Sequence, residues 1–282
     1  MLFFTHKIMR EPSIEIVIGF KGVGKTYTTK DMVNSYIMND PGTGRKGRPV
    51  VVFDVNGEYE DYKAIEYDVL EQNEMKRVSQ LRKVSGPGKY RIVAYKKDRS
   101  IMSPNEKYKV LIDLAKYYRG GLLILEDINA YMMSNVKIDV VAMLIGVRHL
   151  GTDLLIHYQS LRFIPPRMWA NMNFLRWHKQ SDGIDKYKNR LDNFELFKIA
   201  ERISEKMYQT DIRYYFWIDK MGEKLIGVDE LIFEKACLEY LALTPGALKQ
   251  RELLSKMTMP GEASGKGQAV KTFIEEKKKQ YL

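Results

Sequence analysis

The chain has almost no cysteine. Its 282 residues include one, Cys237, so no disulfide can form within it. A single cysteine is typical of proteins kept in a reducing compartment, because small secreted domains commonly rely on several disulfides. Histidine is also scarce, and the four histidines show no metal-ligand spacing, so we propose no zinc site from the sequence. They are His6, His149, His157 and His178.

Long apolar runs are missing as well. No uninterrupted apolar stretch approaches the roughly 18–20 residues that a membrane-spanning helix requires. The first residues, 1–7, contain a very short apolar patch and lack the layout of a signal peptide. We therefore expect a soluble protein without a membrane span, located in the cytoplasm.

Positive charge is in excess. The chain has 46 Lys and Arg against 36 Asp and Glu, which gives a formal net charge of +10. This balance favours a polyanionic partner, although a basic surface that only aids solubility would give the same number. Hydrophobic residues make up 45% of the chain, which is ample for a core. The length allows one large domain, or a domain with an appendage.

One stretch organises the rest of the chain. Residues 19–26, Gly-Phe-Lys-Gly-Val-Gly-Lys-Thr, match the phosphate-binding loop G-x-x-x-x-G-K-[ST] at every fixed position. The β-branched run at 13–18 predicts a buried strand before the loop, and residues 27–38 predict a helix after it. A chance glycine-rich turn, or a loop for another anion, is the alternative. The predicted nucleotide-binding residues are Gly19, Gly22, Gly24, Lys25, Thr26 and Tyr27.

The chemistry of such a loop explains these residue types. Glycines let several backbone N–H groups point at one anion, and the helix N-terminus adds its partial positive charge. Lys25 would reach the β and γ phosphates of ATP, and the Thr26 hydroxyl would hold Mg²⁺.

A second acidic motif follows a predicted strand. Four apolar residues at 122–125 precede Glu126 and Asp127, as in a Walker B-type strand. In a parallel sheet beside the phosphate loop, these carboxylates would lie next to Mg²⁺ and the attacking water. We expect Glu126 to face the metal and Asp127 to act as general base or to orient the water. Because strands often end in acids, the motif is weak evidence by itself. Its position about one hundred residues after the phosphate loop makes the Walker B interpretation stronger.

Polar residues follow two other predicted strands. The apolar run at 49–53 ends at Asp54, with Glu58 shortly after it, and both are predicted to contribute to the nucleotide site. The strand at 153–158 ends at Gln159, whose amide would sense the γ phosphate or position water. A plain strand-end glutamine is the alternative. Ligands of open α/β sheets bind at the carboxyl ends of the strands, so these residues should lie beside the phosphate loop.

Alternating strands and helices predict an α/β fold, a three-layer P-loop NTPase sandwich with a mostly parallel central sheet and a small helical C-terminal extension. The predicted strands are 13–18, 49–53, 90–95, 122–125, 153–158 and 173–178, with a hairpin at 212–218 and 224–227. The predicted helices are 27–38, 71–83, 105–119, 137–150 and 187–209.

The end of the chain differs in composition. We place an ATPase domain at 1–243 and a basic, partly helical tail at 244–282, with helices at 247–256 and 268–281. Such a tail would be a solvated helix or would dock on a neighbour; an arm that touches nucleic acid is the alternative, and the first interpretation is favoured.

Two further stretches resemble the FtsK–HerA superfamily of P-loop ATPases. Residues 50–59 look like its strand-two signature, an apolar run followed by D-x-x-G-E-Y. Residues 148–160 are similar to its element of R-x-x-G, a strand and a glutamine, and Ile-Pro-Pro at 164–166 is similar to the I-P that often follows. The resemblance covers about 12–180. The superfamily contains hexameric motors that pump DNA, including packaging ATPases of membrane-containing icosahedral phages and the related Zot-like proteins of filamentous phages.

The resemblance also implies roles for single residues. Arg148 matches the arginine that reaches a neighbour's γ phosphate. By position alone, it would instead be a cation at the C-terminus of its own helix, where it interacts favourably with the helix dipole. Other arginines that we considered for this role are Arg162, Arg167 and Arg176. Glu126 and Asp127 reverse the usual Asp-Glu order, and Tyr158 stands where threonine is common.

The leading hypothesis is a ring-forming ATPase, a hexamer or another ring, that translocates double-stranded DNA in viral genome packaging. Its cofactors would be ATP and Mg²⁺, and its partner a portal or vertex protein. The first alternative is a monomeric P-loop kinase of a small molecule, for which we find no compact lid segment, although the basic residues 45–48 are a candidate. The second is a nucleotide-binding assembly or adaptor protein of Zot type that has lost turnover, which the reversed acids keep open.

Overall fold

The chain divides into two compact units, which are described separately. The computed structural model describes residues 11–42, 44–128, 138–244, 246 and 266–282. Unit 1 is Met1–Phe174 and unit 2 is Leu175–Leu282. This division falls inside the region predicted as one ATPase domain, and the predicted boundary between 243 and 244, at the end of a helix, stays a prediction. Within the described ranges, no helix is both long and apolar enough to cross a membrane.

Unit 1 is built on a parallel sheet with the strand order β3-β4-β2-β5-β6-β1, and every neighbouring pair in it is parallel. Its strands are β1 (Ile14–Ile18), β2 (Pro49–Asp54), β3 (Lys63–Ala64), β4 (Gly88–Val93), β5 (Leu122–Leu125) and β6 (Asp153–Tyr158). In β1, β2, β5 and β6 every residue is buried, as expected of mostly apolar strands that are covered on both faces.

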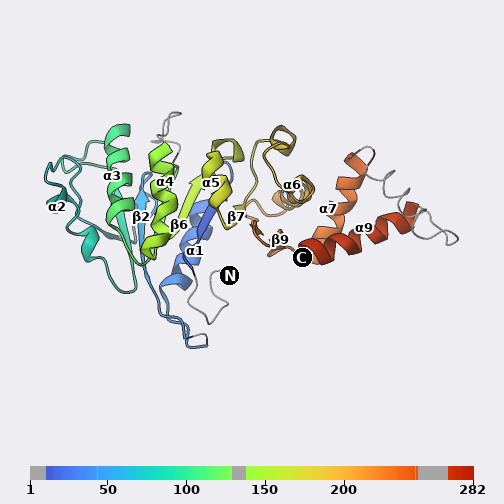
Figure 1. Ribbon diagram of the computed structural model, residues 1–282, viewed down its shortest axis with the longest axis horizontal. Coiled ribbons are helices and arrows are strands. Elements are labelled where there is room, and N and C mark those ends of the chain that lie inside the picture. Colours follow the sequence, from blue (N-terminus) through green and yellow to red (C-terminus); the bar gives the residue numbers. More distant parts are fainter. Residues whose placement is uncertain (1–10, 43, 129–137, 245, 247–265) are drawn as a thin grey trace. The chain divides into compact units, whose positions relative to one another are not determined.

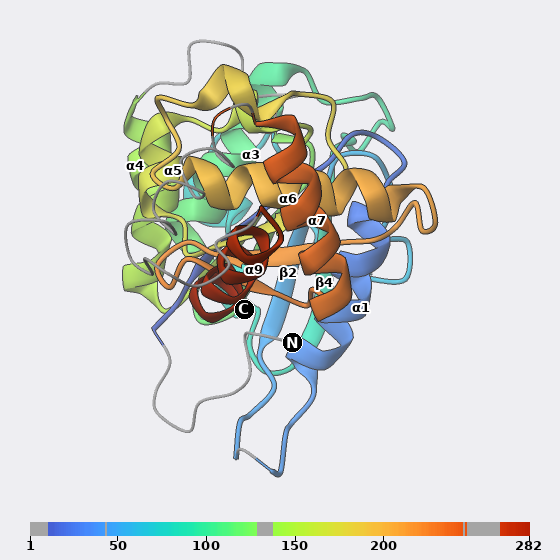
Figure 2. The same ribbon diagram turned by 90° about the vertical axis from the view of Figure 1, so that its right-hand side faces the viewer.

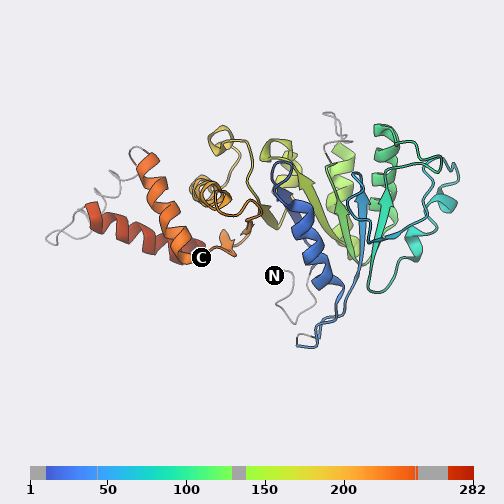
Figure 3. The ribbon, with the colours of Figure 1, turned by 180° about the vertical axis from the view of Figure 1, so that it is seen from behind.

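Helices cover both faces of this sheet. The helices of unit 1 are α1 (Lys25–Ile37), α2 (Glu74–Arg77), α3 (Pro104–Tyr117), α4 (Ile138–Gly146) and α5 (Pro166–Asn171). Helix α1 lies on one face, and α3 and α4 lie on the other, as the front and back views show (Figures 1 and 3). Val33 and Tyr36 of α1 pack on side chains of four strands. The predicted three-layer α/β sandwich is confirmed.

The predicted helix at 71–83 was wrong in its extent. The chain forms the single turn α2 and then a 3₁₀ turn, η2 (Leu81–Lys83). The Arg77 guanidinium fixes this segment, because its Nε lies 2.6 Å from Oδ2 of Asp113 in α3. The Tyr67 hydroxyl donates to the same carboxylate oxygen at 2.7 Å. This buried ion pair and the buried Leu81 place the segment against α3, and tertiary contacts therefore outweigh its helix propensity.

Unit 2 combines a hairpin with long helices. Strand β7 (Phe174–Trp177) leads into it, and β8 (Phe216–Asp219) pairs with β9 (Lys224–Ile226) in the antiparallel hairpin that the sequence predicts. Helix α6 (Phe194–Tyr208) begins later than the predicted residue 187. The reason is local, because the Asn193 side chain accepts the backbone N–H of Leu196 and caps the helix there.

The sequence-based prediction missed one long helix, α7 (Glu230–Leu243). Its signals are present in the sequence: Asp229 Oδ1 accepts two backbone N–H groups of the first turn, and Glu230 follows it. The buried side recurs at helical spacing, with Phe233, Ala236, Cys237, Tyr240 and Leu241. Short helix α5, which has proline at its first position, was missed as well.

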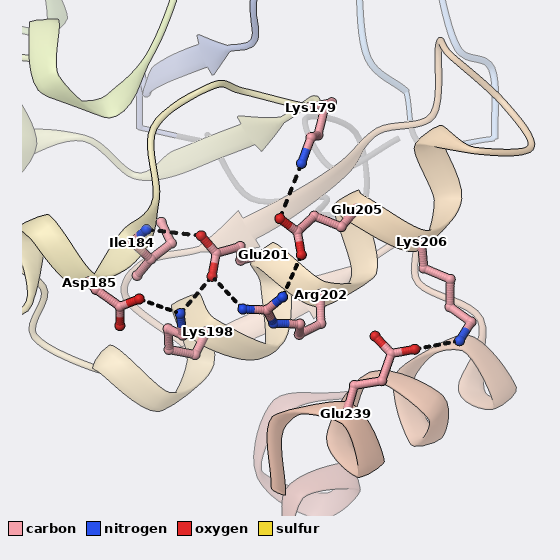
Figure 4. Close-up of polar contacts among 9 residues, drawn as sticks. All are labelled: Lys179, Ile184, Asp185, Lys198, Glu201, Arg202, Glu205, Lys206 and Glu239. Atoms are coloured by element: carbon pink, nitrogen blue, oxygen red, sulfur yellow. Dashed lines mark hydrogen bonds and ion pairs between the residues drawn. The ribbon is translucent and has the colours of Figure 1, made fainter. Parts of the chain in front are cut away.

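A network of ion pairs holds the elements of unit 2 together (Figure 4). At its centre, the buried Lys198 of α6 donates to Asp185 and Glu201 at 3.0 and 2.7 Å. The second oxygen of Glu201 accepts the backbone N–H of Ile184 at 2.9 Å. The outer pairs are Lys179 with Glu205, Arg202 with Glu201 and Glu205, and Lys206 with Glu239 of α7. The network fastens the segment after β7 to α6, and α6 to α7.

The last helix of the chain packs within unit 2. Helix α9 (Lys266–Tyr281), predicted at 268–281, lies beside α7 (Figure 2). Lys278 forms ion pairs with Glu230 and Glu234 of α7, and Lys277 forms one with Glu195 of α6. These lysines are therefore neutralised within unit 2 itself, and docking of the tail on a neighbour stays a prediction. The predicted helix at 247–256 lies outside the described residues.

Candidate nucleotide site

The phosphate loop joins β1 to α1 in unit 1. Gly22 and Gly24 adopt φ angles of 91° and 85°, a left-handed conformation that glycine accepts without strain. Gly24 is also the N-cap residue of α1, and no side chain caps this helix. The first backbone N–H groups of α1 thus have no side-chain acceptor. They supply the partial positive charge that an anion at this position would neutralise.

Lys25 folds back over its own loop. Its Nζ donates to the carbonyl oxygens of Gly19 and Phe20 at 2.6 and 3.0 Å. Burial lowers the pKa of the Lys25 ammonium, and nearby carboxylates, chiefly Asp127 and then Glu126, offset part of that effect. The ammonium is therefore poorly solvated and close to acidic side chains. The phosphates of a bound nucleotide would replace its contacts with the two carbonyl oxygens.

Three oxygen ligands from three elements meet at Thr26. Its Oγ1 lies 2.5 Å from Oε2 of Glu58 and 2.9 Å from Oε1 of Glu126. A hydroxyl has one proton, so Thr26 can donate to only one of these carboxylates at a time. Mg²⁺ prefers such hard oxygen ligands and usually combines one or two carboxylates with water and phosphate oxygens. The residues therefore fit a magnesium ion, as predicted for Thr26 and Glu126, whose metal role stays a prediction.

The Glu126 carboxylate is buried and tightly held. The Tyr59 hydroxyl donates to its Oε1 at 2.9 Å, and Nδ1 of His157 lies 3.5 Å from the same oxygen. Burial alone would raise the pKa of Glu126, but the contacts with His157, Thr26 and Tyr59 outweigh it and lower the pKa. Glu126 is thus a carboxylate at neutral pH in spite of its burial. Tyr59 and His157 are site residues that the sequence-based prediction missed.

The neighbouring Asp127 has a different environment. It is only partly buried, and its Oδ1 accepts a hydrogen bond from Nε2 of the exposed Gln159 at 3.2 Å. Its φ angle of 41° lies in the left-handed region, which is uncommon for any residue other than glycine. This turn directs the two consecutive acids apart, with Glu126 toward Thr26 and Asp127 toward Gln159. Asp127 and Gln159 thus contact each other after β5 and β6, a contact that the sequence did not predict, and their catalytic roles stay predictions.

Asp54 organises the loop that carries Glu58. Its two carboxylate oxygens accept the backbone N–H groups of Glu58 and Tyr59 at 2.9 and 3.2 Å. Arg91 of β4 donates to Oδ2 at 3.0 Å, and Asp54 is fully buried. These contacts give Asp54 a positioning role for two site residues. Its predicted direct contact with the nucleotide stays a prediction, as does that of Tyr27, which is 61% exposed on the first turn of α1.

Arg148 lies just before the amino end of β6, whereas the phosphate loop lies at the carboxyl ends of the strands. It belongs to the 3₁₀ turn η4 (Val147–Leu150), which precedes β6, whereas Gln159 follows β6. At about 3.3 Å per residue, this strand separates the two by roughly 17–20 Å. Within one subunit, Arg148 is therefore far from its own phosphate loop, and its predicted finger role requires a neighbouring subunit.

The rival arginines differ in exposure. Arg162 and Arg167 are exposed on the segment that follows Gln159 in unit 1, and the Arg162 guanidinium stacks 4.5 Å from the Phe163 ring centroid. Arg176 is fully buried in unit 2, against the rings of Tyr215 and Trp217. A buried arginine cannot extend toward a neighbour without unfolding its surroundings. Arg176 is therefore the weakest of these three candidates for the arginine finger.

Several solved structures resemble this chain to different degrees. The genome packaging NTPase B204 of Sulfolobus turreted icosahedral virus 2, in complex with sulfate, is 14% identical with a TM-score of 0.50, and the alignment covers 77% of this chain and 95% of B204. The structure of B204 in complex with ATP-gammaS is 15% identical with a TM-score of 0.48, and the alignment covers 77% of this chain and 96% of B204. The N-terminal domain of zonular occludens toxin from Neisseria meningitidis is 14% identical with a TM-score of 0.36, and the alignment covers 64% of this chain and 91% of that domain. A search of curated proteins found no match.

Fold and site together define a P-loop NTPase. The parallel sheet, the glycine loop ahead of α1 and the acids at the ends of neighbouring strands form the nucleotide-binding architecture of that class. The family model of the HerA helicase central domain matches residues 17–214, which is well over half of the chain. The chain belongs to this family, and it is a HerA-like P-loop ATPase.

Proposed function

We propose that this protein is an ATP-hydrolysing, ring-forming motor that translocates double-stranded DNA during viral genome packaging. The observation that carries the proposal is the convergence of Thr26, Glu58 and Glu126 beside an Asp127–Gln159 pair in a HerA-family chain. The net charge of +10 supports a nucleic-acid partner. The fold shared with B204, which is described as a genome packaging NTPase, supports packaging as the setting.

Nucleotide binding follows from the phosphate loop. The N–H groups at the start of α1 and the Lys25 ammonium would bind the phosphates of ATP. Thr26 and Glu126 would hold Mg²⁺, and Glu58 would contribute through the same cluster. The ion supplies charge neutralisation on the β and γ phosphates. The protein's own contribution is to hold these oxygens together before the nucleotide arrives.

Asp127 and Gln159 would handle the attacking water. The Gln159 amide donates to Asp127, which fixes the carboxylate while leaving it open to solvent. Asp127 would accept a hydrogen bond, and finally a proton, from the water that attacks the γ phosphorus, and ADP would leave. Gln159 also follows β6 directly, which supports a role for it in sensing the γ phosphate.

Ring assembly would complete the site. Because Arg148 lies at the opposite edge of its own sheet, it would act on the nucleotide of an adjoining subunit. An arginine supplied in this way stabilises the charge that develops in phosphoryl transfer. The basic surface would contact DNA phosphates without reading base sequence. We propose the host cytoplasm or the virion as the location and a portal or vertex protein as the docking partner.

The deciding experiment measures oligomeric state and ATP hydrolysis in the presence of ATP, Mg²⁺ and duplex DNA. We expect a ring whose hydrolysis rate rises with DNA. Lys25→Ala should abolish hydrolysis without changing the circular dichroism spectrum, and Lys21→Ala, an exposed lysine of the same loop, is the matched control.

Other outcomes would identify the alternatives. A stable monomer that phosphorylates a small molecule would replace the motor with a kinase. A chain that binds ATP without turnover would instead be a nucleotide-binding assembly protein.

A further inference from the structure

One histidine connects two parts of the nucleotide site. His157 occupies β6 and is 2% exposed. Its Nε2 lies 3.0 Å from Oγ1 of Thr29, a fully buried residue of α1, and its Nδ1 lies 3.5 Å from Oε1 of Glu126. The imidazole thus bridges the helix that follows the phosphate loop and the acid that follows β5.

A polar side chain at this place is unusual for its strand. The three preceding residues of β6, at 154–156, are buried and aliphatic. Leu155 shares the sheet face of His157, because side chains alternate along a strand, and it packs in the apolar core under α1. A polar ring in such surroundings costs free energy unless its nitrogen atoms are hydrogen-bonded. Both nitrogen atoms of His157 face oxygen atoms of the site.

The chemistry of the partners determines where the ring carries its proton. A carboxylate only accepts hydrogen bonds, so the nitrogen that faces Glu126 must carry a proton to bind it. In the neutral ring, Nε2 is then an acceptor, and the Thr29 hydroxyl is the group that donates to it. The carboxylate therefore selects the tautomer, and the Thr29 hydroxyl, which can donate or accept, donates to the remaining nitrogen and holds the ring in place.

We propose that His157 is a positioning residue, which orients the Glu126 carboxylate toward Thr26 through an Nδ1–H donor held in place by Thr29. Tyr59 donates to the same oxygen from another element and gives Glu126 a second support. Metal ligands are commonly fixed by such outer hydrogen bonds, whose loss weakens metal binding. The inference rests on the proposed function in one respect, namely that Glu126 serves a metal–nucleotide complex.

The first test needs neither nucleotide nor metal. Long-range ¹H–¹⁵N correlation spectra of the histidine-labelled full chain report which ring nitrogen is protonated, and only four histidines contribute. His157→Gln assigns the signal. We expect a proton on Nδ1 of His157. A ring that carries its proton on Nε2 alone would overturn the inference whatever the protein's activity.

The second test measures the Mg²⁺ concentration that half-saturates binding of a fluorescent ATP analogue. His157→Leu should raise it about 10–100-fold, the usual consequence of losing such a support. His157→Asn, whose amide can place an N–H near the former Nδ1, should recover most of the loss. Leu155→Val, on the same strand face, is the control and should leave the Mg²⁺ dependence unchanged.

The outcomes separate this inference from the proposed function. If His157→Leu binds the analogue with the wild-type Mg²⁺ dependence, His157 does not position Glu126. The inference also fails if Leu155→Val shifts the dependence as much as His157→Leu does. If the wild-type protein binds the analogue without any need for Mg²⁺, the proposed metal site is refuted, while the proton position still decides the contact between His157 and Glu126.

Discussion

Replacing Asp54 by asparagine tests whether the loop at 54–59 positions Glu58 and Tyr59 beside the proposed Mg²⁺ site. The carboxylate accepts from Glu58 N, Tyr59 N and Arg91 Nη1 at 2.9, 3.2 and 3.0 Å. Asparagine offers one carbonyl oxygen, and its NH₂ group must then face one of these donors. At least one hydrogen bond to a charged group is lost, and the others lose their charge assistance.

The magnitude follows from these contacts. A hydrogen bond to a charged group contributes about 1.5–3 kcal/mol, and Asp54 is fully buried, so Asp54→Asn should lower the free energy of unfolding by about 2–4 kcal/mol. Urea unfolding followed by circular dichroism measures this change. Asp98→Asn is the matched control, because Asp98 caps a turn at Ser100 in the same way but is exposed. Its unfolding midpoint should stay close to that of the wild-type protein.

The same variant separates positioning from direct nucleotide binding. If Asp54 positions Glu58 and Tyr59, the loss of stability should come with a higher Mg²⁺ requirement for ATP binding. A variant as stable as the wild-type protein would refute the reasoning from hydrogen bonds. Lost ATP binding with unchanged stability would instead support the direct nucleotide contact predicted from the sequence.

Three more predictions concern single residues. Asp127→Asn should bind ATP without cleaving it, whereas Glu126→Gln should first raise the Mg²⁺ requirement; exchanged phenotypes would reverse the two assignments. Rings mixed from Arg148→Ala and Lys25→Ala subunits should recover hydrolysis that neither variant has alone, since an arginine finger contributes about 10³–10⁵ in rate. Normal hydrolysis by Arg148→Ala rings would place the finger elsewhere. Burial raises the pKa of the Cys237 thiol to about 12, so it is neutral at pH 8 and should react with a thiol reagent only upon unfolding; rapid labelling of the native protein would contradict this.

The sequence was most informative where a local pattern meets a buried environment. The phosphate loop, the strand of four apolar residues before Glu126 and the strand that ends at Gln159 have clear signatures, and the structure places all three at one edge of the sheet. The parallel pairing of the strands follows from the alternation of strands and helices, whereas their order in the sheet was not predicted. The three layers were predictable from the same alternation.

Contacts between distant residues were not predictable in this way. Tyr59 and His157 reach Glu126 from two other strand ends, and no spacing in the sequence reveals that they share one carboxylate oxygen. The short α2 depends on the ion pair of Arg77 with Asp113, which lies far along the chain. Helix α7 is a different case, because its cap and periodicity were visible and were overlooked.

The register of the parallel strands has a practical consequence for protein engineering. Ile18 lies opposite Tyr158, and Leu125 opposite Ile156, so neighbouring strands reach the nucleotide edge at almost the same level. One residue inserted within β6 would turn His157 to the other face and displace Gln159 from Asp127. The bridge between Asp40 and Arg45 precedes β2 at the opposite edge. A fluorescent label or a short peptide tag belongs beside that bridge, where lengthening the chain leaves every strand in register.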